Sequence, residues 1–214
     1  MTQTELENLV PSTHLKRVIA VLRLTGWASF IIQIGLGATT GVLLLLALSG
    51  RNFNQAIAPT PSISGAVVTQ TQTTTPGLGI SIFWAVCGFM SLLFGIYLAF
   101  RLIRFSKRLN NPNRAIHPKR SKVMEVLRLG VMTAFVGMLL SILGSVATLS
   151  VLLGKSVTQP QGVAIYDPNR IIRSLDVFVA AANTTVITAH FVGAVTMLGI
   201  FNWLHNPSDP DLIP

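Results

Sequence analysis

Four side chains that could bind or relay an ion recur at one spacing near the carboxyl end of the chain. Asp176, Asn183 and His190 are seven residues apart, and Met197 continues the series. Seven residues fall about 20° short of two helical turns, so on a helix these side chains share one face at depths about 10 Å apart. Carboxylate, amide and imidazole groups suit a borderline divalent metal ion. The pattern predicts a binding or transport path, with His190 and Asp176 as candidate metal ligands.

Each of these residues also has a structural interpretation. Asp176 follows Arg173 by three residues at an expected helix start, where a carboxylate complements the helix dipole. Asn183 could join two helices by a hydrogen bond, and His190 could be a neutral imidazole bonded to a neighbouring helix. The sequence leaves open whether the stripe is functional or structural.

The elements that must position these side chains are long apolar segments. Charged residues make up only 11% of the 214-residue chain, against about 25% in a soluble domain. They are absent from four stretches, and about 20 apolar residues suffice to cross the hydrocarbon of a bilayer. The sequence therefore predicts an all-α, polytopic membrane protein: a bundle of four transmembrane helices with short loops, spanning residues 24–50, 77–100, 129–154 and 177–204. His190 falls near the middle of the last span, where ionisable groups are rare and often mark ion pathways.

Basic residues set the expected orientation, because cytoplasmic flanks of membrane spans are enriched in Lys and Arg. Most lie before the first span or between the second and third, and few lie in the other two connections. Both termini are therefore expected in the cytoplasm, as an amphipathic segment (residues 1–23) and a tail (residues 205–214). Within the first segment, Ser12 or Thr13 could cap a short interfacial helix. Arg101, Arg104 and Arg108 should continue the second helix as far as Asn110, facing anionic headgroups or a partner protein.

Small residues at packing intervals predict close contacts between helices. They are Gly37 and Gly41 in the first span and Gly137, Ser141 and Ser145 in the third. Such residues let helix backbones approach in lipid. A seam inside the bundle and a contact between copies in a homo-oligomer both remain open.

A short internal echo indicates a possible duplication. Val21-Leu22-Arg23-Leu24 recurs as Val126-Leu127-Arg128-Leu129, and Ile82-Phe83-Trp84-Ala85 resembles Val177-Phe178-Val179-Ala180. Two tandem helix pairs, related by an axis along the membrane normal, would explain both echoes.

Several classes of function find no support in the sequence. The single cysteine, Cys87, excludes an internal disulfide, and the sequence has no phosphate-binding loop or His-Glu-x-x-His motif. No enzyme activity or resident cofactor is expected. Nucleic-acid binding is not expected either, because the basic residues flank the spans and lack the aromatic residues of a stacking platform.

The stretch from Leu175-Asp176-Val177-Phe178 through Asn183-Thr184 to Ala189-His190-Phe191 resembles a family of small four-span proteins from cyanobacteria and plastids. The plant member of that family, the permease in chloroplasts, is assigned both to iron uptake and to the inner-envelope protein translocon. The chain departs from the family pattern at Ala181 and Thr185, where the family has Gln and Asn. The resemblance implies an integral protein of a cyanobacterial plasma or thylakoid membrane.

Two hypotheses follow from these observations. In the first, the chain is a permease for iron or another divalent metal ion, with Asp176, Asn183, His190 and Met197 along the path. In the second, it is a non-transporting subunit or assembly factor of a larger photosynthetic or protein-import membrane complex. That subunit would dock through its small-residue seams and its basic connection.

Overall fold

The computed structural model describes residues 13–56, 78–111, 113, 117–157 and 174–205. Within these ranges it contains four helices: α2 (Thr13–Ala56), α3 (Leu78–Leu109), α4 (Arg120–Val157) and α5 (Ser174–His205). Each helix is long and apolar enough to cross a membrane. The prediction of an all-α, four-span membrane protein is confirmed. Residues 1–12 and 206–214, and most of the connections after the first and third spans, lie outside the described part.

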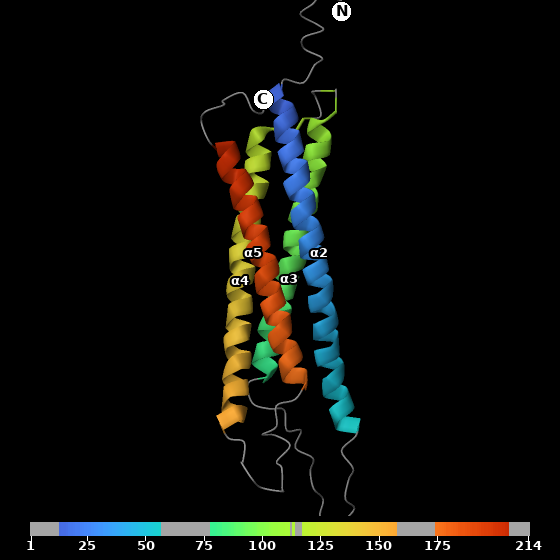
Figure 1. The fold of residues 1–214 in the computed structure, drawn as a ribbon, viewed down its shortest axis with the longest axis vertical. Helices are drawn as coiled ribbons and strands as arrows, with labels where there is room; N and C mark the ends of the chain where they lie inside the picture. Colours follow the sequence, from blue (N-terminus) through green and yellow to red (C-terminus); the bar gives the residue numbers. More distant parts are fainter. Residues whose placement is uncertain (1–12, 57–77, 112, 114–116, 158–173, 206–214) are drawn as a thin grey trace, which may run out of the picture.

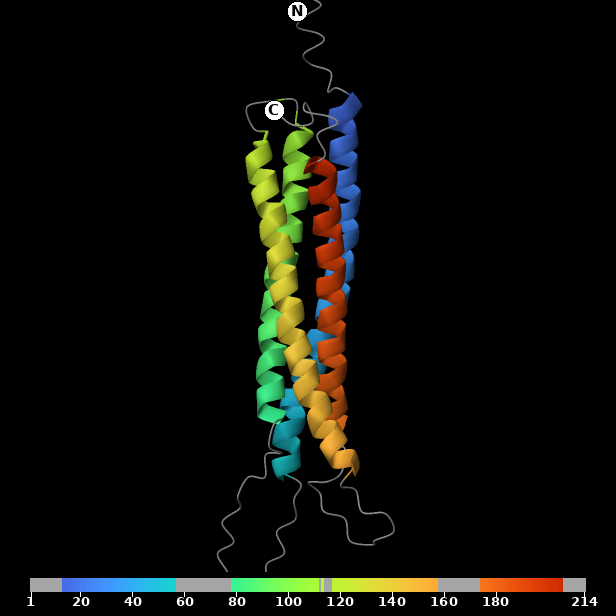
Figure 2. The same ribbon diagram turned by 90° about the vertical axis from the view of Figure 1, so that its left-hand side faces the viewer.

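The helices form an antiparallel bundle in which chain neighbours lie side by side (Figures 1 and 2). α3 packs against α2 and α4, α5 packs against the same two helices, and α3 and α5 also meet across the centre. Within the described helices, α2 and α4 make no mutual contact. Exchanging α2 with α4 and α3 with α5 preserves every one of these helix pairs. A tandem duplication would produce this arrangement, and the duplication itself stays a prediction.

The helices are longer than the bilayer requires. The 38 residues of α4 span about 57 Å, roughly twice the thickness of the hydrocarbon. As predicted, α3 continues past Phe100 and ends at Leu109, where the next residues are Asn110-Asn111-Pro112. The N–H of Asn110 bonds to the carbonyl of Ser106 and completes the last turn. The excess length lies mainly at the end of the bundle rich in Lys and Arg, called here the basic end.

The prediction of a short interfacial helix before the first span is wrong for the described residues of that segment, which begin at Thr13. α2 runs unbroken from Thr13 into the span. Its Val18, Ile19 and Leu22 are buried, because at helical spacing they enter one apolar cluster with residues of the other three helices. The segment belongs to the bundle core and does not lie flat on the membrane surface.

The interior changes character along the bundle. At the basic end one large apolar cluster joins all four helices, including Leu22, Leu102, Leu127 and Leu204. Towards the opposite end the apolar contacts divide into three smaller clusters. Polar side chains of α5 and its neighbours lie between them. Large apolar side chains cover the outer face, as expected for helices that contact lipid.

Candidate functional site: a polar column in the bundle

α5 buries the stripe that the sequence predicted. Asp176, Asn183, His190 and Met197 all lie in the interior, none with more than 3% of its surface exposed. Asp176 and Met197 are 21 residues apart, about 31 Å along the helix, which is about the thickness of the hydrocarbon. We call these four residues the polar column.

α4 accommodates the column with glycines at the same spacing. Gly144, Gly137 and Gly130 lie opposite Asn183, His190 and Met197 respectively. A Cβ atom at Gly144 would lie 2.8 Å from Asn183 Oδ1, and one at Gly130 would lie 3.2 Å from Met197 Cγ. A Cβ at Gly137 would overlap the imidazole of His190. The column side chains of α5 therefore occupy the space beside α4 that would be filled by side chains if these α4 positions were not glycine.

Asp176 forms an ion pair within the bundle. Lys155 Nζ lies 2.5 Å from Asp176 Oδ2, with the two side chains 5% and 1% exposed. The sequence interpretation placed Lys155 just after the third span. It placed Asp176 at a helix start three residues after Arg173, which lies outside the described residues. That interpretation missed the partner, because α4 continues to Val157 and carries Lys155 inwards to the first turn of α5.

Asn183 faces a small cluster of hydroxyl groups. Its Nδ2 donates to Thr148 Oγ1 at 3.4 Å, and Thr148 also contacts Ser81 Oγ on α3. Asn183 Oδ1 is buried and has no hydrogen-bond partner within the described residues. Asn183 therefore connects α5 to α4 and leaves one acceptor oxygen unused.

His190 joins α5 to α3. Its Nε2 lies 3.2 Å from the carbonyl oxygen of Gly88. A carbonyl can only accept a hydrogen bond, so Nε2 carries the hydrogen, and in the neutral ring Nδ1 is the acceptor. This is the interhelical hydrogen bond that the structural interpretation of His190 anticipated.

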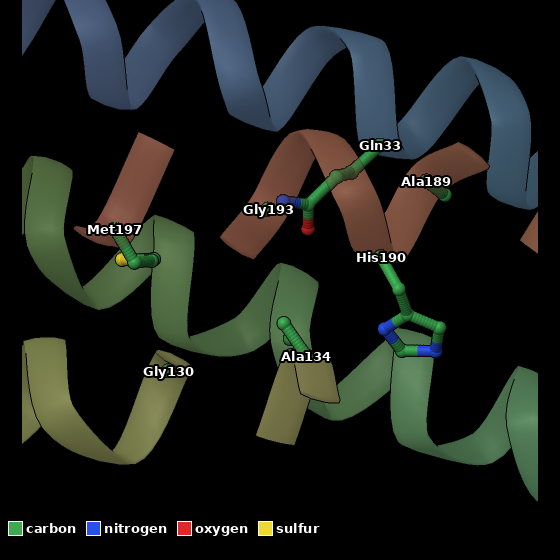
Figure 3. A pocket seen from close by; sticks show the side chains of 8 residues that line it. Gln33, Gly130, Ala134, Ala189, His190, Gly193 and Met197 are labelled. Atoms are coloured by element: carbon green, nitrogen blue, oxygen red, sulfur yellow. The ribbon is translucent and has the colours of Figure 1, made fainter. Parts of the chain in front are cut away.

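Gln33 of α2 is a site residue that the stripe on α5 did not predict. Its Nε2 donates to Ser29 Oγ at 2.9 Å, while its buried Oε1 has no partner in the described part of the chain. The side chain extends towards Gly193 of α5, and Gln33 and His190 both line a small cavity (Figure 3). The lining residues come from all four helices: Gln33, Gly95, Gly130, Ala134, Ala189, His190, Gly193 and Met197. The sequence signal was a lone amide that shares one face of the first span with small residues such as Gly26 and Ser29.

The predicted packing seams lie between helices of the same chain. A Cβ atom added at Gly37 would lie 3.4 Å from Ile96 and 3.6 Å from Leu92 of α3, and one at Gly41 would lie 3.5 Å from Phe89 of the same helix. Ser141 is buried and bonds to the carbonyl of Gly137, whereas Ser145 is only partly buried.

The predicted contact residues of α3 point outwards. Arg101, Arg104 and Arg108 are exposed, in the part of α3 that extends towards the basic end. The guanidinium of Arg104 lies 4.9 Å from the ring centre of Phe100, and that of Arg101 lies 5.7 Å from the ring centre of Phe105. These contacts hold both side chains along the helix.

The described residues contain no group of three or more His, Cys, Asp or Glu side chains that could hold a metal ion. Asp176 and His190 lie 14 residues apart on α5, about 21 Å, so they cannot bind one ion together. Any ion would meet the members of the column one after another.

Fold and site together define a polytopic integral membrane protein whose four helices enclose a polar column. The chain belongs to the family described as "Protein of unknown function (DUF3611)", whose model matches residues 12–205. It is similar to the protein TIC 21, chloroplastic, of Arabidopsis thaliana, with 28% identity over 161 residues that cover 71% of this chain and 52% of the relative. The chain thus spans about half the length of that curated relative. No solved structure matches. The predicted similarity to a plastid membrane protein family is confirmed.

Proposed function

We propose that the protein is a permease-like membrane protein that moves a small divalent metal ion, with iron as the first candidate, along the polar column. The similarity to a chloroplast membrane protein supports a role linked to membrane transport. The choice of iron depends on the family resemblance described above. An orientation with both termini in the cytoplasm, a homo-oligomeric state and contact with anionic lipid headgroups are parts of the same proposal.

One observation carries this proposal: buried polar groups follow one another through the bundle from Asp176 to His190, over about 21 Å of the roughly 30 Å of hydrocarbon. Buried polar groups in a membrane are costly unless they have a partner. Asn183 Oδ1 and Gln33 Oε1 are buried acceptor oxygens without a donor in the described residues. Acceptor oxygens and a neutral imidazole are ligands that a cation can use in sequence.

The packing of α4 against α5 determines how such an ion could pass. Gly137 and Gly144 leave no room beside His190 and Asn183. Passage therefore requires α4 and α5 to separate, as in transporters whose halves move against each other. At the end opposite the basic end, an incoming cation would compete with Lys155 for the carboxylate of Asp176.

A second function is favoured by the same contacts. Asp176 pairs with Lys155 and His190 bonds to Gly88, so these groups already join helices of one chain. A bundle stabilised in this way could serve as a non-transporting subunit or assembly factor of a larger complex. Its exposed basic side chains on α3 would then provide a docking surface.

The test is uptake of Fe(II) and Mn(II) into vesicles that contain the purified protein. His190→Ala should abolish uptake in protein that still folds and inserts, because the imidazole lies near the middle of the last span. His190→Gln should retain part of the uptake if hydrogen bonding to Gly88 is the main role of the side chain. Thr188→Val is the matched control, because Thr188 is exposed on the same helix and bonds only to its own backbone.

Wild-type vesicles that take up no more metal than empty vesicles would refute the permease proposal. Equal uptake by wild type and His190→Ala would remove the column from the mechanism. Recovery of the protein within a larger assembly, after extraction in mild detergent, would then favour the subunit function.

A further inference from the structure

The cavity between α2 and α5 has the size of one water molecule. About 10 Å³ is open to the centre of a water, which is the space that a single bound water needs. The cavity is bordered by Gln33, Gly95, His190 and Met197, among others (Figure 3). Cavities that stay empty in proteins are apolar, and this one has polar groups on its wall.

The first polar group is the amide of Gln33. The side chain is 2% exposed, and its Nε2 is used by Ser29. Its Oε1 has no partner among the described residues and faces Gly95, where a Cβ atom would lie 3.8 Å away. This oxygen needs a hydrogen-bond donor that the surrounding side chains do not supply.

The second polar group is the imidazole of His190. Because Nε2 donates to the Gly88 carbonyl, Nδ1 of the neutral ring is an acceptor. Nδ1 lies on the side of the ring that faces Gln33 (Figure 3). Two acceptors on one small cavity require a ligand that donates two hydrogen bonds and is no larger than water.

We propose that this cavity binds one internal water molecule that donates hydrogen bonds to Gln33 Oε1 and to His190 Nδ1. The water completes a chain of hydrogen bonds from α2 through α5 to the Gly88 carbonyl on α3. It also holds the orientation of the imidazole, whose tautomer the Gly88 carbonyl selects. The site does not depend on transport of any ion, and its test involves none.

Met197 provides a reporter, because its buried side chain lines the same cavity. Radiolysis of the purified protein by X-rays creates hydroxyl radicals from bound water, and these oxidise nearby methionine sulfur. In wild type, Met197 should oxidise rapidly despite its burial. Gly95→Ala should abolish the rapid oxidation, because its methyl group fits beside Gln33 Oε1 without a clash and fills the cavity.

Gly41→Ala is the matched control, since it adds a methyl group at another contact between α2 and α3, 3.5 Å from Phe89 and away from the cavity. It should leave the oxidation of Met197 at the wild-type rate. Gln33→Met removes the acceptor at similar volume and should slow the oxidation as Gly95→Ala does. This second variant decides the question if Gly95→Ala fails to fold.

A second measurement uses the ¹⁵N chemical shifts of His190 in labelled protein. The proposal expects a protonated Nε2 and an unprotonated, hydrogen-bonded Nδ1. In the Gly95→Ala variant, the ¹⁵N shift of Nδ1 should move towards the value of a nitrogen without a hydrogen bond. Slow oxidation of Met197 in wild type would show a dry cavity and overturn the proposal. Rapid oxidation that persists in both Gly95→Ala and Gln33→Met, or a protonated Nδ1, would overturn it as well.

Discussion

Replacing Asp176 by Asn should destabilise the bundle far more than an ordinary substitution near a helix end. The carboxylate is 1% exposed and lies 2.5 Å from the ammonium group of Lys155, which is 5% exposed. The amide removes the negative charge that lies 2.5 Å from the ammonium group of Lys155 but keeps the shape of the side chain. A buried lysine would then be left without the carboxylate that faces it.

The size of the effect follows from burial. Breaking a buried ion pair by removing one partner costs about 3–5 kcal/mol, whereas an exposed pair contributes about 0–1 kcal/mol. Domains have a total stability of about 5–15 kcal/mol, so the loss would be a large part of it. Replacing both partners, as in Lys155→Met with Asp176→Leu, should bring the stability back to within about 1 kcal/mol of wild type, or above it.

The assay is unfolding in mixed micelles by titration with sodium dodecyl sulfate, followed by tryptophan fluorescence. The single variants Lys155→Met and Asp176→Leu, the double variant and wild type form a cycle that isolates the interaction between the partners. A cost below about 1 kcal/mol for both single variants would mean that water or headgroups screen the pair. That result would refute the burial of Lys155 and the inward course of α4 at this end.

Two further predictions use simple substitutions. Gly137→Ala should destabilise the bundle, because its methyl group would overlap the imidazole of His190. Gly35→Ala is the control and should have no such effect, because nothing lies within 4 Å of its Cβ position. Equal effects of the two variants in the detergent titration would contradict the fit of α4 to the polar column. Cysteines placed singly at Gln70 and Asn113, in a Cys87→Ala background, should react with an impermeant thiol reagent from opposite sides of the membrane. Labelling of Asn113 from outside would reverse the proposed orientation.

The sequence by itself determined the features that depend on one helix at a time. Charge-free stretches defined the four spans, and Asn110-Asn111-Pro112 marked the end of α3. The seven-residue spacing placed Asp176, Asn183 and His190 on one face, because residues within a helix have a rigid angular relation. None of this required knowledge of the neighbouring helices.

The tertiary structure decided which partners those faces meet. In a membrane protein the lipid-facing surface of a helix bundle is as apolar as the bundle interior. The pattern of apolar residues therefore does not show which face of a helix turns inwards. Lys155 became the partner of Asp176 only where the end of α4 meets the start of α5. Gln33 lies beside the column because packing turns that face of α2 towards Gly193. The prediction of an interfacial helix before the first span was wrong for the same reason. The apolar face of that segment packs in the protein core, whereas the sequence indicated only a membrane surface.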